Sequence, residues 1–225
     1  MVFTGCSDDE VTAPPITPDE TVIDIDGNVY HTVKIGTQVW MVENLRVTKF
    51  NDGGAIPLVE DNEAWSDLST AGYCWYNNDQ ANFKAVYGAL YNWHTVENDK
   101  LCPAGWHVAS NDEWKTLIDY LGGEDVAGGK LKEFGTSHWL SPNAGATNSF
   151  NFSAVPGGGR YFDGTWWEVG GFANYWTSTS DPIPGDLNNH DETFAVNMNL
   201  HATDGGIYRD HNLKPCGFSI RCIKD

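Results

Sequence analysis

The sequence LCPAGWHVASNDEWKTLIDYL, residues 101–121, contains the clearest local signal in the chain. Ser110 is a favourable helix N-cap, and Glu113 follows it at the spacing of a capping box. Apolar residues then recur at i, i+3, i+4 and i+7, as one stripe of an amphipathic helix: Trp114, Leu117, Ile118 and Leu121. Gly122 and Gly123 end the helix, because glycine tolerates the left-handed backbone found there. The pattern predicts a helix that packs against a sheet and carries no catalytic group.

The composition is that of a folded and strongly acidic protein. The chain has 225 residues, enough for a substantial core, and its aromatic content of 13% favours a β-rich protein over disorder. The net charge is −18, from 31 acidic and 13 basic residues. A phosphate backbone would be repelled by this charge, so nucleic-acid binding is excluded. An anionic membrane surface would also be repelled, unless a covalent anchor holds the protein there.

Outside the capped helix, the pattern is mainly one of short strands. Two further helices are expected, at residues 82–96 and, more weakly, at 124–134, where Gly128 and Gly129 lower the propensity. Glycines 157–159 predict a flexible corner before a hairpin strand at residues 165–169. Alternating or β-branched segments bounded by turn residues predict the other strands: 22–25, 29–35, 39–47, 150–154, 174–180, 193–200, 206–209 and 216–223.

The N-terminal residues resemble a lipoprotein export signal. The sequence before and including Cys6, FTGC, is similar to a lipobox, in which the cysteine is acylated. An acidic run at residues 7–10 resembles the surface-export signal of Bacteroidetes lipoproteins, and a Pro- and Thr-rich segment follows. We therefore expect residues 1–6 to be a signal-peptide remnant, 7–21 a tether and 22–225 a single domain. The expected location is the outer membrane, with the domain lipid-anchored at the cell surface.

Several motifs spread along the chain resemble one bacterial family. They are DGNVY (26–30), IGTQVWMVENL (35–45), CWYNND (74–79), YGALYNW (87–93), residues 102–114, YWTS (175–178) and GFSIRCIKD (217–225). Together they are similar to the Fibrobacter succinogenes major paralogous domain family of secreted and lipidated proteins. The resemblance implies an α+β, C-type lectin-like fold, with two main helices packed on a twisted antiparallel sheet with long loops. It implies no catalytic residues. Apart from the calcium considered below, we expect no cofactor.

Four cysteines remain if Cys6 carries lipid. An even number in an exported protein suggests two disulfides, for which three pairings exist. The resemblance to the C-type lectin-like fold implies that Cys102 pairs with Cys222, which leaves Cys74 for Cys216. The spacings do not match a zinc site, because CxxC and HExxH motifs are both absent.

The last third of the chain contains the candidate ligand-binding residues. Aromatic side chains that stack on sugar rings or fill a partner's pockets are expected at Tyr161, Trp166, Trp167 and Tyr175. Alternation along a strand lets only one of Trp166 and Trp167, and only one of Tyr175 and Trp176, face outward. A loop at residues 181–192 adds polar groups suited to hydroxyls: Asp186, Asn188, Asn189, His190 and Asp191.

Three functions remain open. The first is a non-catalytic module at the cell surface that binds a glycan or a protein. The second is a structural accessory subunit of an outer-membrane complex. The third is an enzyme, either a hydrolase using acidic residues of the last third or a relative of formylglycine-generating enzymes, which use reactive cysteines. Calcium is a candidate ligand of the 181–192 loop, although the EF-hand spacing and the EPN, QPD and Trp-Asn-Asp motifs of calcium-dependent lectins are missing.

Overall fold

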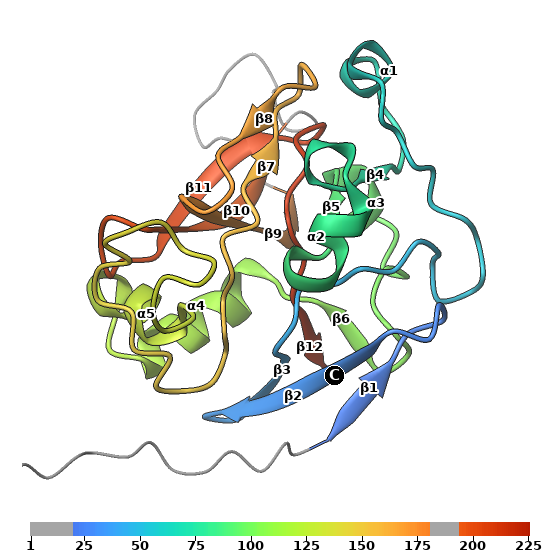
Figure 1. Cartoon of the computed structure of the whole chain (residues 1–225). Coiled ribbons are helices and arrows are strands. Elements are labelled where there is room, and N and C mark those ends of the chain that lie inside the picture. Colours follow the sequence, from blue (N-terminus) through green and yellow to red (C-terminus); the bar gives the residue numbers. More distant parts are fainter. Residues whose placement is uncertain (1–19, 181–193) are drawn as a thin grey trace, which may run out of the picture.

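The computed structural model describes residues 20–180 and 194–225, which form a mixed α+β fold with two main curled antiparallel sheets (Figure 1). The larger sheet has the strand order β1-β2-β3-β12-β6. Its strands are β1 (Thr21–Ile23), β2 (Val29–Ile35), β3 (Gln38–Met41), β12 (Cys222–Lys224) and β6 (Trp106–Val108). The last strand thus lies between two strands from the first half of the chain, which closes the fold.

The second sheet has three long strands in the order β11-β10-β9. They are β9 (Phe172–Ser180), β10 (Phe194–His201) and β11 (Tyr208–Leu213). Two short hairpins accompany the sheets, formed by β4 (Tyr73–Cys74) with β5 (Leu90–Tyr91) and by β7 (Gly159–Arg160) with β8 (Trp166–Trp167). The helices are α1 (Asn62–Ser66), the 3-10 helix η1 (Tyr76–Asn78), α2 (Gln80–Tyr87), α3 (Trp93–Val96), α4 (Asn111–Tyr120) and α5 (Glu124–Leu131).

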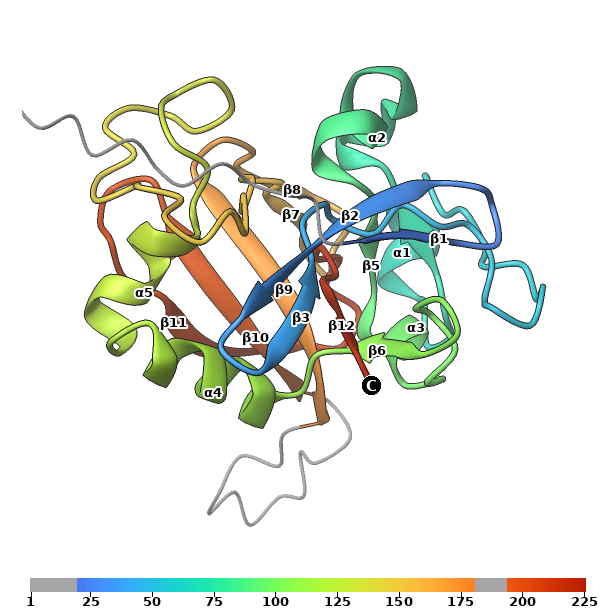
Figure 2. The same ribbon diagram turned by 90° about the horizontal axis from the view of Figure 1, so that it is seen from below.

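The capped helix predicted from residues 110–121 is confirmed as α4. The Ser110 hydroxyl accepts from the Glu113 amide, and the Glu113 carboxylate accepts from the Ser110 amide, so both halves of the capping box are present. The apolar stripe is buried, and Trp114 lies 4.9 Å from Trp40 and 5.6 Å from Tyr175 between ring centroids. Helix α4 therefore packs against strands of both main sheets, beside α5 (Figure 2).

The single helix expected at residues 82–96 is wrong. Helix α2 ends at Tyr87, a short strand follows, and α3 begins after Asn92, whose side chain caps it. Gly88 breaks the helix with φ at 74°, and a Cβ there would lie 2.6 Å from the Leu45 carbonyl oxygen. Helical periodicity was a poor guide here because the backbone must pass close to the loop that contains Leu45.

Two further expectations for the second half need correction. The 150–154 segment makes no strand and contributes one isolated bridge, between Lys132 and Ala154. Residues 157–160 are no flexible corner, since Gly159 and Arg160 form β7 and the Arg160 side chain is fully buried. Its guanidinium is held by the carbonyl oxygens of Val59, Glu60 and Gly164 and by the Asn62 side chain.

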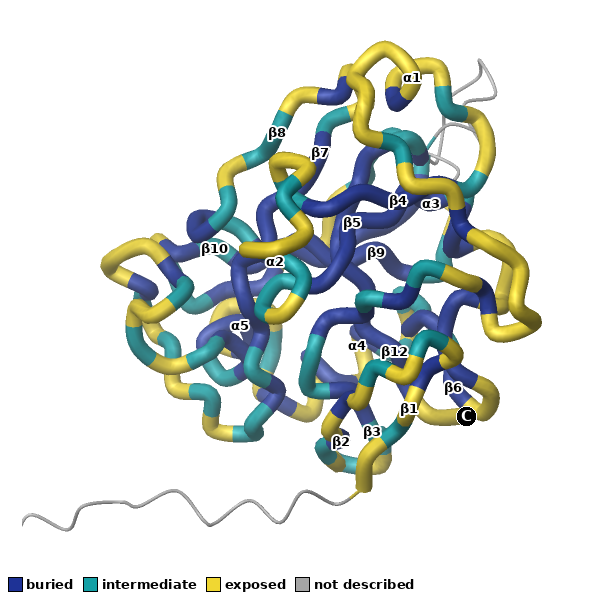
Figure 3. The backbone as a smooth tube through the Cα atoms, turned by 45° about the vertical axis from the view of Figure 1, so that its right-hand side comes forward, coloured by how far each residue is buried: buried dark blue, intermediate teal, exposed yellow. Residues whose placement is uncertain are grey.

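Strands β9 and β10 of the three-stranded sheet run through the buried interior (Figure 3). Tyr175 and Trp176 point to opposite faces of β9, and both are fully buried, because a separate apolar cluster covers each face. The expectation that one of them faces outward is therefore wrong. Tyr175 is part of the core rather than of a ligand site.

One disulfide joins Cys102 to Cys222, with a Cα–Cα distance of 6.1 Å, as the resemblance implied. The second expected bond, between Cys74 and Cys216, is not formed, and both residues are buried free thiols. They lie in different apolar clusters, Cys74 with Trp65 and Leu90 and Cys216 in the main core. Burial raises the pKa of each thiol to about 12.

Candidate ligand-binding surface

The β7–β8 hairpin displays two adjacent tryptophans on opposite sides. Trp166 pairs across the hairpin with Arg160, and the guanidinium carbon lies 4.7 Å from its ring centroid. Trp167 pairs with Gly159, which has no side chain, so the indole instead stacks on Tyr161. The predicted split of this pair between two faces is confirmed by their separate sets of neighbours. Both rings are half-buried.

Trp167 belongs to a continuous line of five rings, which we call the ring row: Tyr161, Trp167, Phe172, His201 and Tyr208. Successive ring centroids are 4.8, 6.1, 5.0 and 4.9 Å apart. The row starts on the hairpin and crosses one end of the three-stranded sheet, because Phe172 pairs with His201 and the register of β10 with β11 places Tyr208 nearby. All five side chains reach the surface, and Tyr208 is 44% exposed.

Polar groups accompany the far end of the ring row. The Asp204 carboxylate lies 3.7 Å from His201 Nδ1, and its hydrogen bond with Tyr208 raises the pKa of the tyrosine. Asp204 also accepts from the Gly206 amide, which fixes the turn between β10 and β11. The surface therefore combines apolar ring faces with a carboxylate and a phenol, which are hydrogen-bonding partners for hydroxyl groups.

The opposite side of the hairpin has a structural role. Trp166 contacts Tyr76 at 5.3 Å, Tyr76 contacts Phe83 at 5.0 Å, and Phe83 contacts Tyr87 at 5.6 Å. Helix α2, which contributes Phe83 and Tyr87, has no fully buried residue. These ring contacts, and not core burial, hold α2 against the hairpin. We therefore infer that Trp166 serves packing, and the expectation that it binds a ligand stays a prediction.

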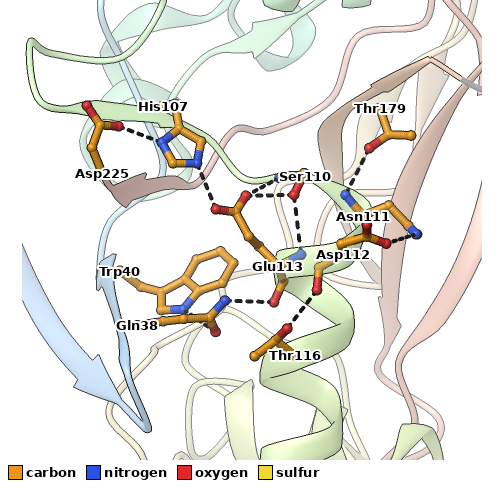
Figure 4. Close-up of polar contacts among 10 residues, drawn as sticks. All are labelled: Gln38, Trp40, His107, Ser110, Asn111, Asp112, Glu113, Thr116, Thr179 and Asp225. Carbon is orange, nitrogen blue, oxygen red and sulfur yellow. Dashed lines mark hydrogen bonds and ion pairs between the residues drawn. The ribbon is translucent and has the colours of Figure 1, made fainter.

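A network of polar side chains centred on His107 surrounds the start of α4 (Figure 4). His107 Nδ1 is 2.7 Å from Asp225 and Nε2 is 2.8 Å from Glu113, so the imidazole bridges the final residue and the capping box. The Ser110 hydroxyl hydrogen-bonds to Glu113 and not to His107. The arrangement has no nucleophile–base pair of the kind that serine hydrolases use, and its evident role is to join α4 to the last strand.

The family model of the Fibrobacter succinogenes major domain matches residues 33–224. The chain belongs to this family. No curated protein and no solved structure matches it. The matched region includes the whole ring row, both disulfide cysteines, and His107 and Glu113 of the α4 network, whereas Asp225 lies one residue beyond the match. The family's description assigns no activity.

The predicted site residues of this family member divide into three groups. Tyr161 and Trp167 are brought together, whereas Trp166 and Tyr175 serve packing. The polar loop residues Asp186, Asn188, Asn189, His190 and Asp191 lie outside the described residues, as does Cys6. Phe172, His201 and Tyr208 were missed. A hairpin centred on Asp204 and Gly205, which the sequence indicates, would have placed His201 near Tyr208.

The described residues contain neither a cluster of metal-binding side chains nor a reactive thiol. Within residues 20–180 and 194–225, no group of three or more His, Cys, Asp or Glu side chains is arranged to hold a metal ion. Over the same ranges, no helix is long and apolar enough to cross a membrane. Cys222 is in a disulfide, and burial keeps Cys216 protonated with its pKa near 12, unlike a reactive thiol.

Proposed function

We propose that the domain is a non-catalytic module that binds a carbohydrate through the ring row. The observation that supports this most is the line of five half-exposed rings from four separate segments, with centroids 4.8–6.1 Å apart. Aromatic faces bind the apolar faces of sugar rings, and the Asp204 carboxylate and the Tyr208 phenol offer hydrogen bonds to sugar hydroxyls. A row of this length suits a chain of several sugar units better than a single one.

The ring row is also held in place by the core and by paired strands, so its rings have fixed positions. Trp167 packs at 5.8 Å on Phe218, which is fully buried, and His201 and Phe172 sit on paired strands. A site on a rigid scaffold loses little entropy on binding.

We also propose that the fold is C-type lectin-like. Two features support this: two helices pack against a curled sheet that the last strand closes, and a disulfide joins Cys102 to that strand.

The proposed location is the cell surface, through a lipid on Cys6 and a tether at residues 7–21. The support is the sequence alone, namely the lipobox-like FTGC and the acidic run after it. Metabolic labelling with an alkyne fatty acid tests this. We expect the chain expressed with a signal peptide to be labelled and its Cys6→Ala variant to be unlabelled. Labelling of both would contradict the lipid assignment.

A panel of neutral polysaccharides tests the binding function directly. The chain is run by affinity electrophoresis through gels containing each polysaccharide, together with two tyrosine variants. Tyr208, at the end of the ring row, is 44% exposed, and Tyr120, on α4, is 59% exposed, so the two are a matched pair. We expect retardation of the unmodified chain, a loss of about 2 kcal/mol of binding free energy for Tyr208→Ala, and none for Tyr120→Ala. Absence of retardation in every gel, or equal losses for both variants, would contradict the proposal.

A further inference from the structure

Lys132 is a fully buried lysine that lies directly behind the ring row. It follows the last residue of α5, and its ammonium donates to the carbonyl oxygens of Ala144, His201 and Asp204 at 2.9, 2.8 and 2.6 Å. The Trp139 ring lies 5.2 Å from Nζ and covers the ammonium on another side. A single cation thus joins the end of α5 to a loop 12 positions further on and to the segment 201–204, which is 69 to 72 positions away.

The number of N–H donors on the Lys132 side chain matches the three carbonyl acceptors around it only when the amine is protonated. An ammonium has three N–H groups and no lone pair, so it satisfies all three carbonyl oxygens. A neutral amine has two N–H groups and would leave one buried carbonyl without a donor, which costs free energy. Burial lowers the pKa of Lys132 to about 8, so the group is still largely protonated at neutral pH.

The two carbonyls from the β10–β11 connection tie Lys132 to the ring row. His201 is the fourth ring of the row, and Asp204 is the carboxylate that contacts both His201 and Tyr208. The ammonium therefore holds the backbone at both ends of the segment 201–204. The position of this backbone sets where His201, Asp204 and Tyr208 lie, and these are side chains that we propose contact the ligand.

We infer that Lys132 is the positioning residue of the ring row, an internal cation whose three carbonyl bonds set the turn that presents His201, Asp204 and Tyr208. The ligand-binding half of this inference rests on the proposed function. A tethered ammonium takes the structural role that a bound metal ion has in other loop-rich sites, so we expect carbohydrate binding to survive chelators such as EDTA. Lys132 itself touches no ligand.

The test compares two lysines at the C-terminal end of α5, Lys130 inside the helix and Lys132 directly after it. Lys132→Met removes the cation and keeps the length of the side chain, and Lys130→Met is the matched control, because Lys130 donates to one carbonyl, that of Leu121. Amide hydrogen exchange is measured at Ala202, Gly206 and Ile207 of the turn and at Trp114 and Leu117 of α4. We expect exchange at the turn amides to be about tenfold faster in Lys132→Met only, with α4 unchanged and affinity for the retarding polysaccharide reduced about tenfold. Unchanged turn amides, or the same change in both variants, would overturn the inference.

A second measurement uses the unmodified chain, so it does not depend on the variant folding. Raising the pH from about 7 to about 9.5 removes the proton from Lys132. The titratable groups on the segments packed against it are Asp204 and His201 of the turn and Glu133 and His138 beside α5, and the Asp204 charge raises the pKa of Lys132 against the effect of burial. Because the pKa of Lys132 is lower in the closed turn than in water, an opening that hydrates the amine takes up a proton, so turn exchange, corrected for base catalysis, should fall as the pH rises through about 8. A flat profile would contradict the role of the ammonium. If exchange responds as expected but no polysaccharide binds, the positioning role stands and the proposed function fails.

Discussion

The Trp167 indole stacks on the Tyr161 ring, with centroids 4.8 Å apart and an interplanar angle of 11°. The neighbouring Trp166, on the other side of the same two-residue strand, lies over the Arg160 guanidinium. Two adjacent residues of identical type therefore have different neighbours and, in our account, different roles. One contributes a partly exposed ring to the ligand surface, and the other holds the hairpin to the body of the protein.

Alanine substitutions separate these roles. Trp166→Ala removes a cation–π partner of Arg160 and the ring contact with Tyr76, so we expect it to lower the free energy of unfolding by about 2–3 kcal/mol and to leave affinity per folded molecule unchanged. Trp167→Ala should weaken polysaccharide binding by about 2 kcal/mol. Urea unfolding and calorimetric titration measure the two effects. Equal effects of both substitutions on affinity would show that the hairpin acts as one unit.

The Cys102–Cys222 disulfide should dominate the stability of the closed sheet. It joins residues 120 positions apart, and in the chain-entropy model a loop of this length contributes about 4–5 kcal/mol. We expect Cys222→Ala to lower the free energy of unfolding by about this amount. Thiol counting on the denatured, unreduced chain provides an independent check. Among the described cysteines, only Cys74 and Cys216 should react, and a peptide linking these two would contradict the structure.

His107 should make stability depend on pH. Burial lowers its pKa, but the hydrogen bonds to Asp225 and Glu113 raise it by more, so the folded value lies above the unfolded one. The pKa of Glu113 is lowered, because its hydrogen bonds to Ser110 and His107 outweigh the opposing effect of burial. The histidine contribution is therefore complete below its ordinary pKa of about 6.5 and is lost as the pH rises through the folded value.

The measurement for this network is the thermal midpoint of the chain and of His107→Gln between about pH 5.5 and about pH 8.5. Glutamine keeps hydrogen-bonding capacity without titrating. The midpoint difference between the two proteins should be largest at the acid end and should shrink as the pH rises. A difference that stays constant across this range would mean that the charge on His107 contributes nothing.

For Gly128→Ala, helix propensity and steric overlap predict opposite changes in the free energy of unfolding. Helix propensity alone predicts that Gly128→Ala in α5 stabilises by about 1 kcal/mol. A Cβ at this position would overlap the Gly206 carbonyl in the turn beside the ring row. We therefore expect a loss of about 3 kcal/mol, measured by urea unfolding. Gly54→Ala is the control, because the nearest atom to a Cβ there is an exposed side-chain oxygen of Asp52 at 3.2 Å and not backbone, and it should have little effect.

Features encoded in neighbouring residues were predicted well from the sequence. The capped helix α4 follows from Ser110, Glu113 and the apolar stripe, all of which interact within a few residues. The strand β2 at Val29–Ile35 has the predicted bounds, because its alternation reflects one buried and one exposed face. The link from Cys102 to Cys222 came from family resemblance, since spacing alone leaves three pairings open.

The candidate site depended on long-range pairing and was predicted only in part. Phe172 and Tyr208 join the ring row because the register of three strands brings their ends together, which no local pattern records. Tyr175 was misplaced because β9 is covered on both faces, so that alternation no longer separates core from surface. The role of Gly128 was missed for a similar reason, since its neighbour Gly206 is 78 positions away in the numbering.

The most direct test of the account follows indole and histidine resonances by NMR while a polysaccharide fragment that retards the chain is added. We expect the Trp167 indole and the His201 and Tyr208 ring signals to shift together with one dissociation constant. The signals of Trp114, which is on the fully buried face of α4, and of Tyr120, which is exposed on α4, should stay in place. Saturable shifts confined to α2 or α4, with the ring row unaffected, would contradict the assignment of the ring row as the binding surface.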